Sequence, residues 1–316
     1  MDSSTRCLAR RFAGALRSRG PLTVVPRALA ALLALAPFGA AQDRLTVTRE
    51  ARAIRPGEVV LLTIDAPGST RQVSVRAFDR EWPAYPVPSH AKWESLIGID
   101  LDTKPGTYDA LVTAGPERTT VRLVVTRRAF PTRRLSVNPA LVNPPADQQA
   151  RVEREARHLH DLWDHPAAQR LWTAPFMRPV PDEANSAFGT RSIYNGEARP
   201  PHTGADFLSP TGRPVKAPNA GRIVLADPQY FSGNTVIIDH GLGLFSILAH
   251  LSEIDVKVGD LVTSGQIVGK VGATGRVTGP HLHWGVRLEN ARVDPLSLLY
   301  VLGTAPSSSR GGDRLH

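Results

Sequence analysis

The chain has 316 residues, of which 41% are hydrophobic, so it is long enough for two domains and apolar enough to fold. Its formal net charge of +9 falls to +4 without the first 41 residues, which hold six Arg and one Asp and leave 32 basic and 28 acidic residues. So small an excess of positive charge gives no nucleic-acid footprint, and we expect no nucleic-acid partner.

Residues 1–41 have the features of a signal peptide. Several arginines precede a short apolar segment (ALAALLALA), and small residues follow it, which suits cleavage after Ala41. That segment is too short for a permanent anchor, so we expect an exported protein of the periplasm, cell envelope or medium without stable membrane insertion. Arg10 and Arg11 leave a twin-arginine signal open. The only cysteine, Cys7, lies here, so a metal must be held by His and carboxylate groups.

Residues 42–128 are predicted to form a β-sandwich of immunoglobulin-like type. Stretches rich in β-branched residues at 58–64, 72–78, 107–114 and 119–126 alternate with Pro/Gly turns, as in small sandwiches. The segment carries no visible catalytic chemistry. We therefore expect an accessory module that acts as a spacer or docking domain.

Residues 129–175 are predicted to be a linker with one helix, capped by Asp147 and ended by Pro166. Apolar residues repeat there at helical spacing: Val152, Ala156, Leu159 and Trp163. The helix also carries three histidines: His158, His160 and His165. Side chains two residues apart on a helix point in directions about 200° apart, so His158 and His160 cannot bind the same metal ion.

Residues 176–302 change to short β-strands separated by glycine-rich turns. Strands are expected at 215–217, 221–225, 234–239, 244–251, 266–271 and 281–287. No amphipathic segment of helix length interrupts them, and the polar tail at 303–316 is expected to be disordered. The predicted fold class is therefore mainly β throughout, with one helical connector.

Two histidine motifs in this β-rich region suggest a metal site. His202 and Asp206 lie in a loop that enters a strand, where both can bind one ion and Gly204 relieves crowding as the chain passes it. His281 and His283 lie two apart on a strand, so both imidazoles face one groove and Leu282 faces the other way.

A third imidazole, His250, ends another apolar strand and is expected to face the same groove. A catalytic zinc site needs three protein ligands and an open position, which His202, Asp206 and His283 satisfy. The expected cofactor is Zn²⁺, with His281 and His250 left as general base, proton donor or oxyanion stabiliser.

These motifs belong to a longer pattern that resembles the lysostaphin/LytM-type peptidases. The matching segments are 188–191 (FGTR), 195–196 (NG), 202–206 (HTGAD), 212–217 (GRPVKA), 250–252 (HLS) and 256–283 (VKVGDLVTSGQIVGKVGATGRVTGPHLH). The resemblance runs from about 186 to 300. It implies a barrel-sandwich-hybrid β domain at 176–302, one Zn²⁺, and endopeptidase action on peptidoglycan peptides. We also expect the protein to be a monomer.

The resemblance also implies roles for individual residues: His202, Asp206 and His283 as metal ligands, with His250 and His281 as the catalytic pair. A tyrosine common in the family is Leu248 here, from which we expect an altered groove wall and no loss of zinc. His240 is expected in a turn or supporting role, and Trp284 in the core. Arg191 and Asn195 either line the groove or shape the entry loop.

Two other functions compete with this prediction. A catalytically inactive module that binds peptidoglycan or activates another hydrolase would typically lack some of the five site residues, all of which are present here. A lipoyl- or biotinyl-type carrier would need a modified lysine at a hairpin tip, whereas Lys270 falls inside a predicted strand.

Overall fold

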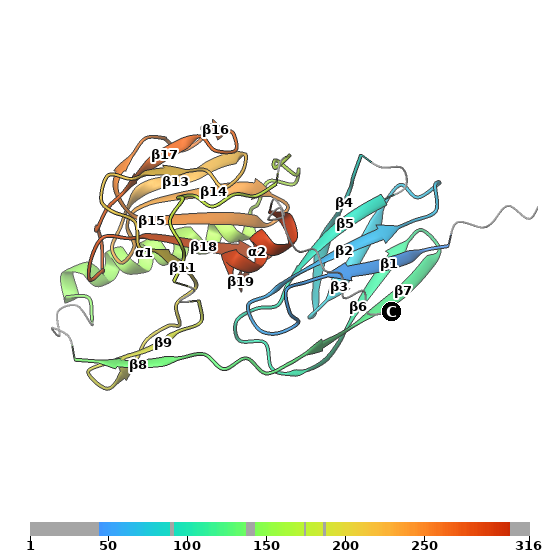
Figure 1. Cartoon of the computed structure of the whole chain (residues 1–316), viewed down its shortest axis with the longest axis horizontal. Helices are drawn as coiled ribbons and strands as arrows, with labels where there is room; N and C mark the ends of the chain where they lie inside the picture. The colour runs from blue at the N-terminus through green and yellow to red at the C-terminus, as the bar shows by residue number, and fades with distance from the viewer. Residues whose placement is uncertain (1–43, 89–91, 137–142, 174, 186–187, 304–316) are drawn as a thin grey trace, which may run out of the picture. The chain divides into compact units, whose positions relative to one another are not determined.

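The computed structural model describes residues 44–88, 92–136, 143–173, 175–185 and 188–303, and is mainly β (Figure 1). The predictions for the signal peptide and for the tail after Gly303 lie outside these residues. Within the described part of the chain, no helix has both the length and the apolar character needed to cross a bilayer.

The N-terminal part of the described chain forms one antiparallel sheet of seven strands, in the order β1-β2-β5-β4-β3-β6-β7. Its strands are β1 (Thr46–Glu50), β2 (Val59–Asp65), β3 (Val73–Ala77), β4 (Arg80–Pro86), β5 (Lys92–Gly98), β6 (Gly106–Ala114) and β7 (Glu117–Val125). Alternation sets the buried face, as in β3, where Val73, Val75 and Ala77 are buried between exposed neighbours. The four strands predicted here are present, and the immunoglobulin-like type stays a prediction.

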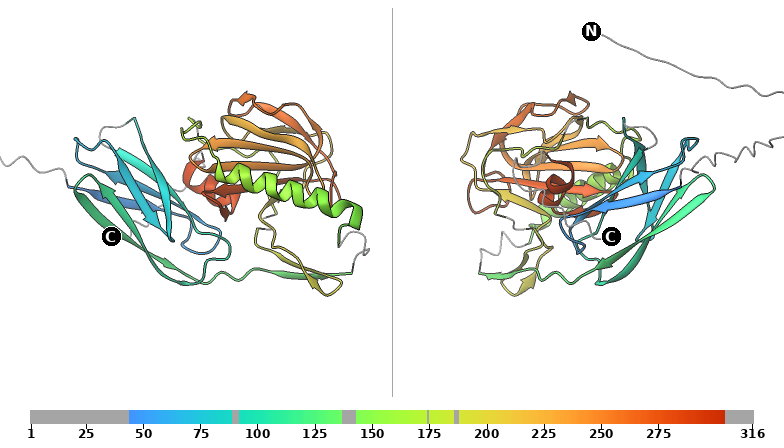
Figure 2. Two further views of the ribbon diagram at one scale, coloured as in Figure 1. Left: turned by 180° about the vertical axis from the view of Figure 1, so that it is seen from behind. Right: turned by 45° about the vertical axis from the view of Figure 1, so that its right-hand side comes forward.

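The predicted helix is α1 (Ala146–Asp164), which lies along one face of the C-terminal sheet (Figure 2). Its N-cap is Pro145, so the prediction of Asp147 as the cap is wrong: Asp147 lies in the first turn. Trp163 packs edge-on against Phe245, with the ring centroids 5.0 Å apart. This aromatic contact anchors the helix to the sheet.

The C-terminal sheet has nine strands, in the order β11-β18-β15-β14-β13-β16, with β12, β17 and β19 joined to its sides. These are β11 (Gly204–Phe207), β12 (Pro214–Lys216), β13 (Gly221–Gln229), β14 (Gly233–Gly241), β15 (Leu244–Ile254), β16 (Leu261–Val262), β17 (Ile267–Val271), β18 (Leu282–Leu288) and β19 (Ala291–Val293). A smaller sheet holds β10 (Glu197–Ala198), β9 (Arg191–Tyr194) and β8 (Thr132–Leu135). The long strand β15 pairs with β14, β17 and β18.

A second helix, α2 (Pro295–Leu302), was not predicted. Asp294 caps it by accepting a hydrogen bond from Leu296 N. Pro295 occupies the first helical position, where a backbone N–H would have no acceptor within the helix. The Asp294 carboxylate is fully buried and forms ion pairs with Arg52 at 2.7 Å and Arg128 at 3.3 Å. Because Arg52 and Arg128 come from the N-terminal sequence, this cluster ties α2 to the first sheet.

Candidate metal and catalytic site

The pairing of β11 with β18 sets the first part of the site. Asp206 is the direct antiparallel partner of His283, and Ala205 is the partner of Trp284. Directly paired residues place their side chains on the same face of a sheet, so the carboxylate meets the imidazole while Trp284 faces the core. Trp284 is fully buried, which confirms its predicted place.

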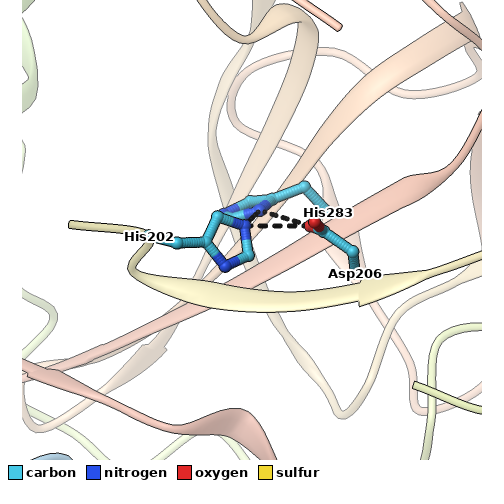
Figure 3. A group of neighbouring side chains, drawn as sticks. All are labelled: His202, Asp206 and His283. Atoms are coloured by element: carbon cyan, nitrogen blue, oxygen red, sulfur yellow. Dashed lines mark hydrogen bonds and ion pairs between the residues drawn. The ribbon is translucent and has the colours of Figure 1, made fainter. Parts of the chain in front are cut away.

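His202, Asp206 and His283 turn their polar atoms toward one another (Figure 3). His202 Nε2 lies 2.9 Å from His283 Nδ1 and 3.0 Å from Asp206 Oδ1, and His283 Nδ1 lies 3.1 Å from the same oxygen. Two imidazole nitrogens and one carboxylate oxygen therefore form a nearly equilateral triangle. Among the His, Cys, Asp and Glu side chains of the described residues, these three lie close enough together to bind one metal ion.

The size of this triangle suits zinc. Edges near 3.0 Å place each corner about 1.7 Å from the centre, and Zn–N and Zn–O bonds of about 2.0–2.2 Å reach all three corners from a point just off the plane. The donor set of two imidazoles and one carboxylate is the one that catalytic zinc sites use with an open fourth position. The residues present therefore fit the ion that the sequence predicts.

Glycines make room for the metal-binding side chains. Gly204 pairs with Gly285, two residues along each strand from Asp206 and His283, and therefore on the same face. A Cβ on Gly204 would lie 2.4 Å from Trp284 O and 2.6 Å from His283 Cε1. Gly204 is thus required by the close approach of the His283 ring and the β18 backbone.

The backbone of the entry loop holds His202 in place. His202 N donates to Thr190 O at 2.9 Å, and His202 O accepts from Gly189 N at 2.7 Å. The ring nitrogen that faces away from the triangle, Nδ1, is buried and has no hydrogen-bond partner. Only Nε2 is thus directed at the other two polar groups.

The electrostatics of the triangle favour an ionised Asp206 carboxylate and a neutral His283. Burial raises the pKa of Asp206, but hydrogen bonds and charge interactions with His202 and His283 outweigh that effect and hold the pKa well below its usual range. Burial is also the main reason why the pKa of His283 is lowered. A carboxylate and neutral imidazoles are the protonation states that a divalent cation requires.

The other two predicted histidines lie beside the triangle. The His281 ring is 4.8 Å from the His250 ring, and His281 Nε2 is 3.8 Å from Asp206 Oδ1. His281 Nδ1 contacts Gly279 O at 2.9 Å, and His250 Nδ1 contacts Thr274 O at 3.0 Å. A carbonyl only accepts, so each Nδ1 carries hydrogen and each neutral ring keeps an unprotonated Nε2.

A bulge in β15 turns His250 toward this group. Ala249 pairs with His283 and so shares its face, and strict alternation would send His250 into the core beside Leu248. His250 instead adopts a φ of +66°, in the left-handed region, and the strand register shifts there. The next residue, Leu251, returns to the core, so the extra residue of the bulge reverses the direction of the imidazole.

His250 is neutral near pH 7. Burial is the largest cause, followed by the neighbouring His283, and together they lower the pKa of His250 to about 4.

Several predictions for neighbouring residues can be checked against the structure. Leu248 is fully buried opposite Trp284, so the expected change in the groove wall is wrong. His240 is also fully buried, with Nδ1 against Ala220 O at 2.8 Å and Nε2 against Ser246 Oγ at 2.9 Å. This hydrogen bonding agrees with a supporting role.

Lys270 and the helical histidines lie away from the triangle. Lys270 lies within β17 and pairs with Glu253 at 2.6 Å, which does not suit a modified lysine at a hairpin tip. His160 and His165 form exposed i,i+4 pairs with Asp164 and Asp161.

Sequence reasoning missed a cluster of one arginine and two aromatic rings on the segments that carry the site histidines. Tyr194, Phe231 and Arg276 come from three segments, and the Arg276 guanidinium lies over both rings. The adjacent aromatics at 230–231, before a glycine turn, were an available signal, but nothing in the sequence indicated that they meet Arg276. Of the two residues left open, Arg191 is exposed on β9, and Asn195 adopts a φ of +51° in the turn after it.

Comparison with known proteins places these motifs in a family. The model described as peptidase family M23 matches residues 200–295. The peptidoglycan DD-endopeptidase ShyA of Vibrio cholerae is 46% identical over 101 residues, which are 32% of this chain and 24% of ShyA. Lysostaphin of Staphylococcus staphylolyticus is 45% identical over 85 residues, which are 26% of this chain and 18% of lysostaphin. The chain thus spans about a quarter or less of the length of these relatives.

A solved structure extends the match beyond the C-terminal sheet. The crystal structure of a Pseudomonas aeruginosa protein assigned to peptidase M23 is 32% identical, with a TM-score of 0.61, and the match covers 79% of this chain and 96% of that one. Identity at this level over nearly the whole relative shows common family membership. With its His/Asp/His triangle, the chain belongs to peptidase family M23.

Proposed function

We propose that this chain is a zinc-dependent endopeptidase that hydrolyses peptide bonds of bacterial peptidoglycan. The observation that carries the proposal is the triangle of His202, Asp206 and His283 beside two further imidazoles with free Nε2 atoms. ShyB and ShyA of Vibrio cholerae, which are both named peptidoglycan DD-endopeptidases, support this substrate class. We further propose export to the cell envelope, where such a substrate lies, and action as a monomer.

His202 Nε2, Asp206 Oδ1 and His283 Nδ1 would hold the zinc ion. When bound, zinc supplies Lewis acidity: it lowers the pKa of water toward neutrality and polarises a carbonyl oxygen. The carboxylate of Asp206 would offset part of the positive charge, and the two imidazoles are half-buried against the sheet.

His281 is the proposed general base. In the neutral ring its Nε2 carries no hydrogen, and this atom lies 3.8 Å from the Asp206 oxygen, beside the metal-binding group. Its Nδ1–H is held by Gly279 O, so the ring cannot turn away without losing that hydrogen bond. His281 therefore takes the proton of the water during attack on the scissile carbonyl.

His250 is proposed as the second proton-transfer group. Its only N–H in the neutral form is bound to Thr274 O, so the neutral ring has no hydrogen for an oxyanion. Once protonated, it has an Nε2–H that can stabilise the oxyanion or reach the leaving amine. The two imidazoles are close enough, at 4.8 Å between centroids, for these duties to be exchanged.

Digestion of purified peptidoglycan sacculi tests the proposal. The purified protein should release soluble peptides, a chelator should stop the release, and added Zn²⁺ should restore it. His281→Ala should lose turnover but keep its zinc, whereas His202→Ala should lose the zinc itself. His160→Ala, a change of the same kind at an exposed helical position, should leave both zinc content and release unchanged.

Two results would overturn the assignment. Full activity of His281→Ala would exclude His281 as the base, and stoichiometric zinc in His202→Ala would exclude that residue as a ligand. Sacculi that bind the zinc-loaded protein but release nothing would instead support an inactive binding or activating module.

A further inference from the structure

Arg276 lies in the loop that positions both proposed catalytic histidines. The loop joins β17 to β18, and its carbonyls at Thr274 and Gly279 accept the Nδ1 hydrogens of His250 and His281. Arg276 lies between these two carbonyls in sequence. Arg276 therefore belongs to the segment that positions the proposed catalytic pair.

Two aromatic rings hold the guanidinium of Arg276. Its central carbon lies 4.5 Å from the centroid of Phe231 and 6.0 Å from that of Tyr194, and Arg276 N donates to Phe231 O at 2.9 Å. Both rings come from segments that also hold site histidines. Ser232, next to Phe231, accepts from His250 N, and Thr190, four residues before Tyr194, accepts from His202 N. The guanidinium thus lies against two segments whose backbones also hold His250 and His202.

The helix α1 fixes the position of the segment that carries Phe231. Glu155 of α1 accepts from Tyr230 N at 2.8 Å, and Arg151 donates to Pro228 O at 3.1 Å. The turn that carries Phe231 is therefore tied to a helix of 19 residues. Because the Arg276 guanidinium packs on this fixed segment, its side chain loses little conformational freedom when it binds a ligand.

No carboxylate among the described residues pairs with the Arg276 guanidinium. Among the described residues, Arg276 forms no ion pair and its guanidinium donates no hydrogen bond to the protein, although it is only partly exposed. Burial is the main cause that lowers the pKa of Arg276, and repulsion from the Arg199 guanidinium adds to it. Arg199 itself has a buried Nε without a hydrogen-bond partner. Because Arg199 is paired with Glu197, the unused guanidinium donors on this loop are those of Arg276.

We propose that Arg276 binds a carboxylate of the substrate peptide and makes the enzyme selective for acidic peptides. The inference rests on the proposed peptidase function and names the chemical class of its substrate. A guanidinium offers parallel N–H donors that match a carboxylate, and the flat rings below it leave its edge available. The carboxylate is either a free C-terminus or an acidic side chain near the scissile bond.

Selectivity can be measured with soluble peptidoglycan fragments in matched pairs. One member keeps its carboxylates and the other has them converted to amides by carbodiimide coupling with ammonia. Two synthetic fragments, amidated only at the C-terminus or only on the side chain, distinguish the two sources of the carboxylate. The readout is the ratio of kcat/KM for the native fragment to that for the amidated fragment.

The protein should prefer the native fragment by about 10- to 100-fold, as expected for charge-assisted hydrogen bonds. Arg276→Gln should bring this ratio toward one, and Arg276→Lys should keep part of it because the charge remains. Arg222→Gln removes an exposed arginine of β13 and should keep the full ratio. Zinc content and the thermal midpoint of each variant show whether the loop still folds.

A ratio near one in the unaltered protein, or the same ratio in Arg276→Gln, would overturn the inference while leaving the peptidase function intact. If neither fragment is cleaved, the proposed function fails, and calorimetric binding of the same fragments still tests Arg276. Tighter binding of the native fragment that disappears in Arg276→Gln would then uphold the carboxylate site, and equal binding would refute it.

Discussion

Replacing Gly204 with alanine should separate the metal-binding residues without removing any of them. The added Cβ would lie 2.4 Å from the backbone oxygen of Trp284, on the strand that pairs with β11. Ordinary contact between carbon and oxygen needs about 3.3 Å, so the strands must move apart by about 0.9 Å. The Cβ also meets the His283 ring at 2.6 Å and 2.7 Å, so the ring cannot take up the strain in its present position.

This displacement exceeds what a metal site tolerates. Asp206 lies two residues beyond Gly204 on the same strand, and metal–ligand distances are held to within about 0.2 Å. We expect zinc affinity to fall by at least 10- to 100-fold, as when supporting groups of a metal site are lost. Overpacking of a strand pair should also lower the free energy of unfolding of the metal-free protein by about 1–3 kcal/mol.

Two measurements check this prediction: zinc affinity by competition with a chromophoric chelator, and urea unfolding of the metal-free protein. Gly68→Ala is the matched control, because nothing lies within 4 Å of a Cβ at that position. It should leave both quantities near their original values. Unchanged zinc affinity in Gly204→Ala would show that the strand contact does not set the metal geometry, and would refute the reasoning.

Three further changes test the packing and charge of the fold. Burial lowers the pKa of His240 to about 4. The stability that its neutral form contributes is therefore complete above pH 6.5, and about 3 kcal/mol of the free energy of unfolding is lost as the pH falls from 6.5 toward 4. His240→Gln should abolish this loss, measured by urea unfolding across pH. Trp163→Ala should lower the free energy of unfolding by about 3 kcal/mol in urea, and Trp163→Phe by clearly less, because Trp163 anchors α1. Asp294→Asn should lower it by about 2 kcal/mol because it removes one of the two buried carboxylates that pair with Arg52 and Arg128, whereas Asp109→Asn, at an exposed pair, should change it by less than about 0.5 kcal/mol. Equal effects of the last two would contradict the buried ion pair.

Strand alternation predicted part of the site from sequence alone. The spacing of His281 and His283 placed both rings on one face, and the β11–β18 register puts Asp206 on that face as well. The direction of His250 could not follow from alternation, because the same rule sends that side chain into the core. The bulge that reverses it depends on a contact between His250 N and Ser232 O, which only the folded chain forms.

The missed secondary structure has physical reasons. β4 contains Pro83 and Pro86, and prolines count against a strand because they cannot donate to a ladder. β4 nevertheless pairs on both sides, with β3 and β5. α2 is short and apolar, so it has no helical periodicity to detect, although Asp294 and Pro295 were a readable start signal.

The geometry divides the site into two supports that respond to different changes. The metal triangle depends on β11 and β18, because Asp206 and His283 are direct partners there. The proton-transfer pair depends on the loop between β17 and β18, because Thr274 O and Gly279 O fix the tautomers of His250 and His281. Arg276 extends from that same loop. A change of loop sequence can therefore alter proton transfer and carboxylate recognition together while the metal ligands keep their places, whereas a disturbance of the strand pair removes the metal first and the chemistry with it.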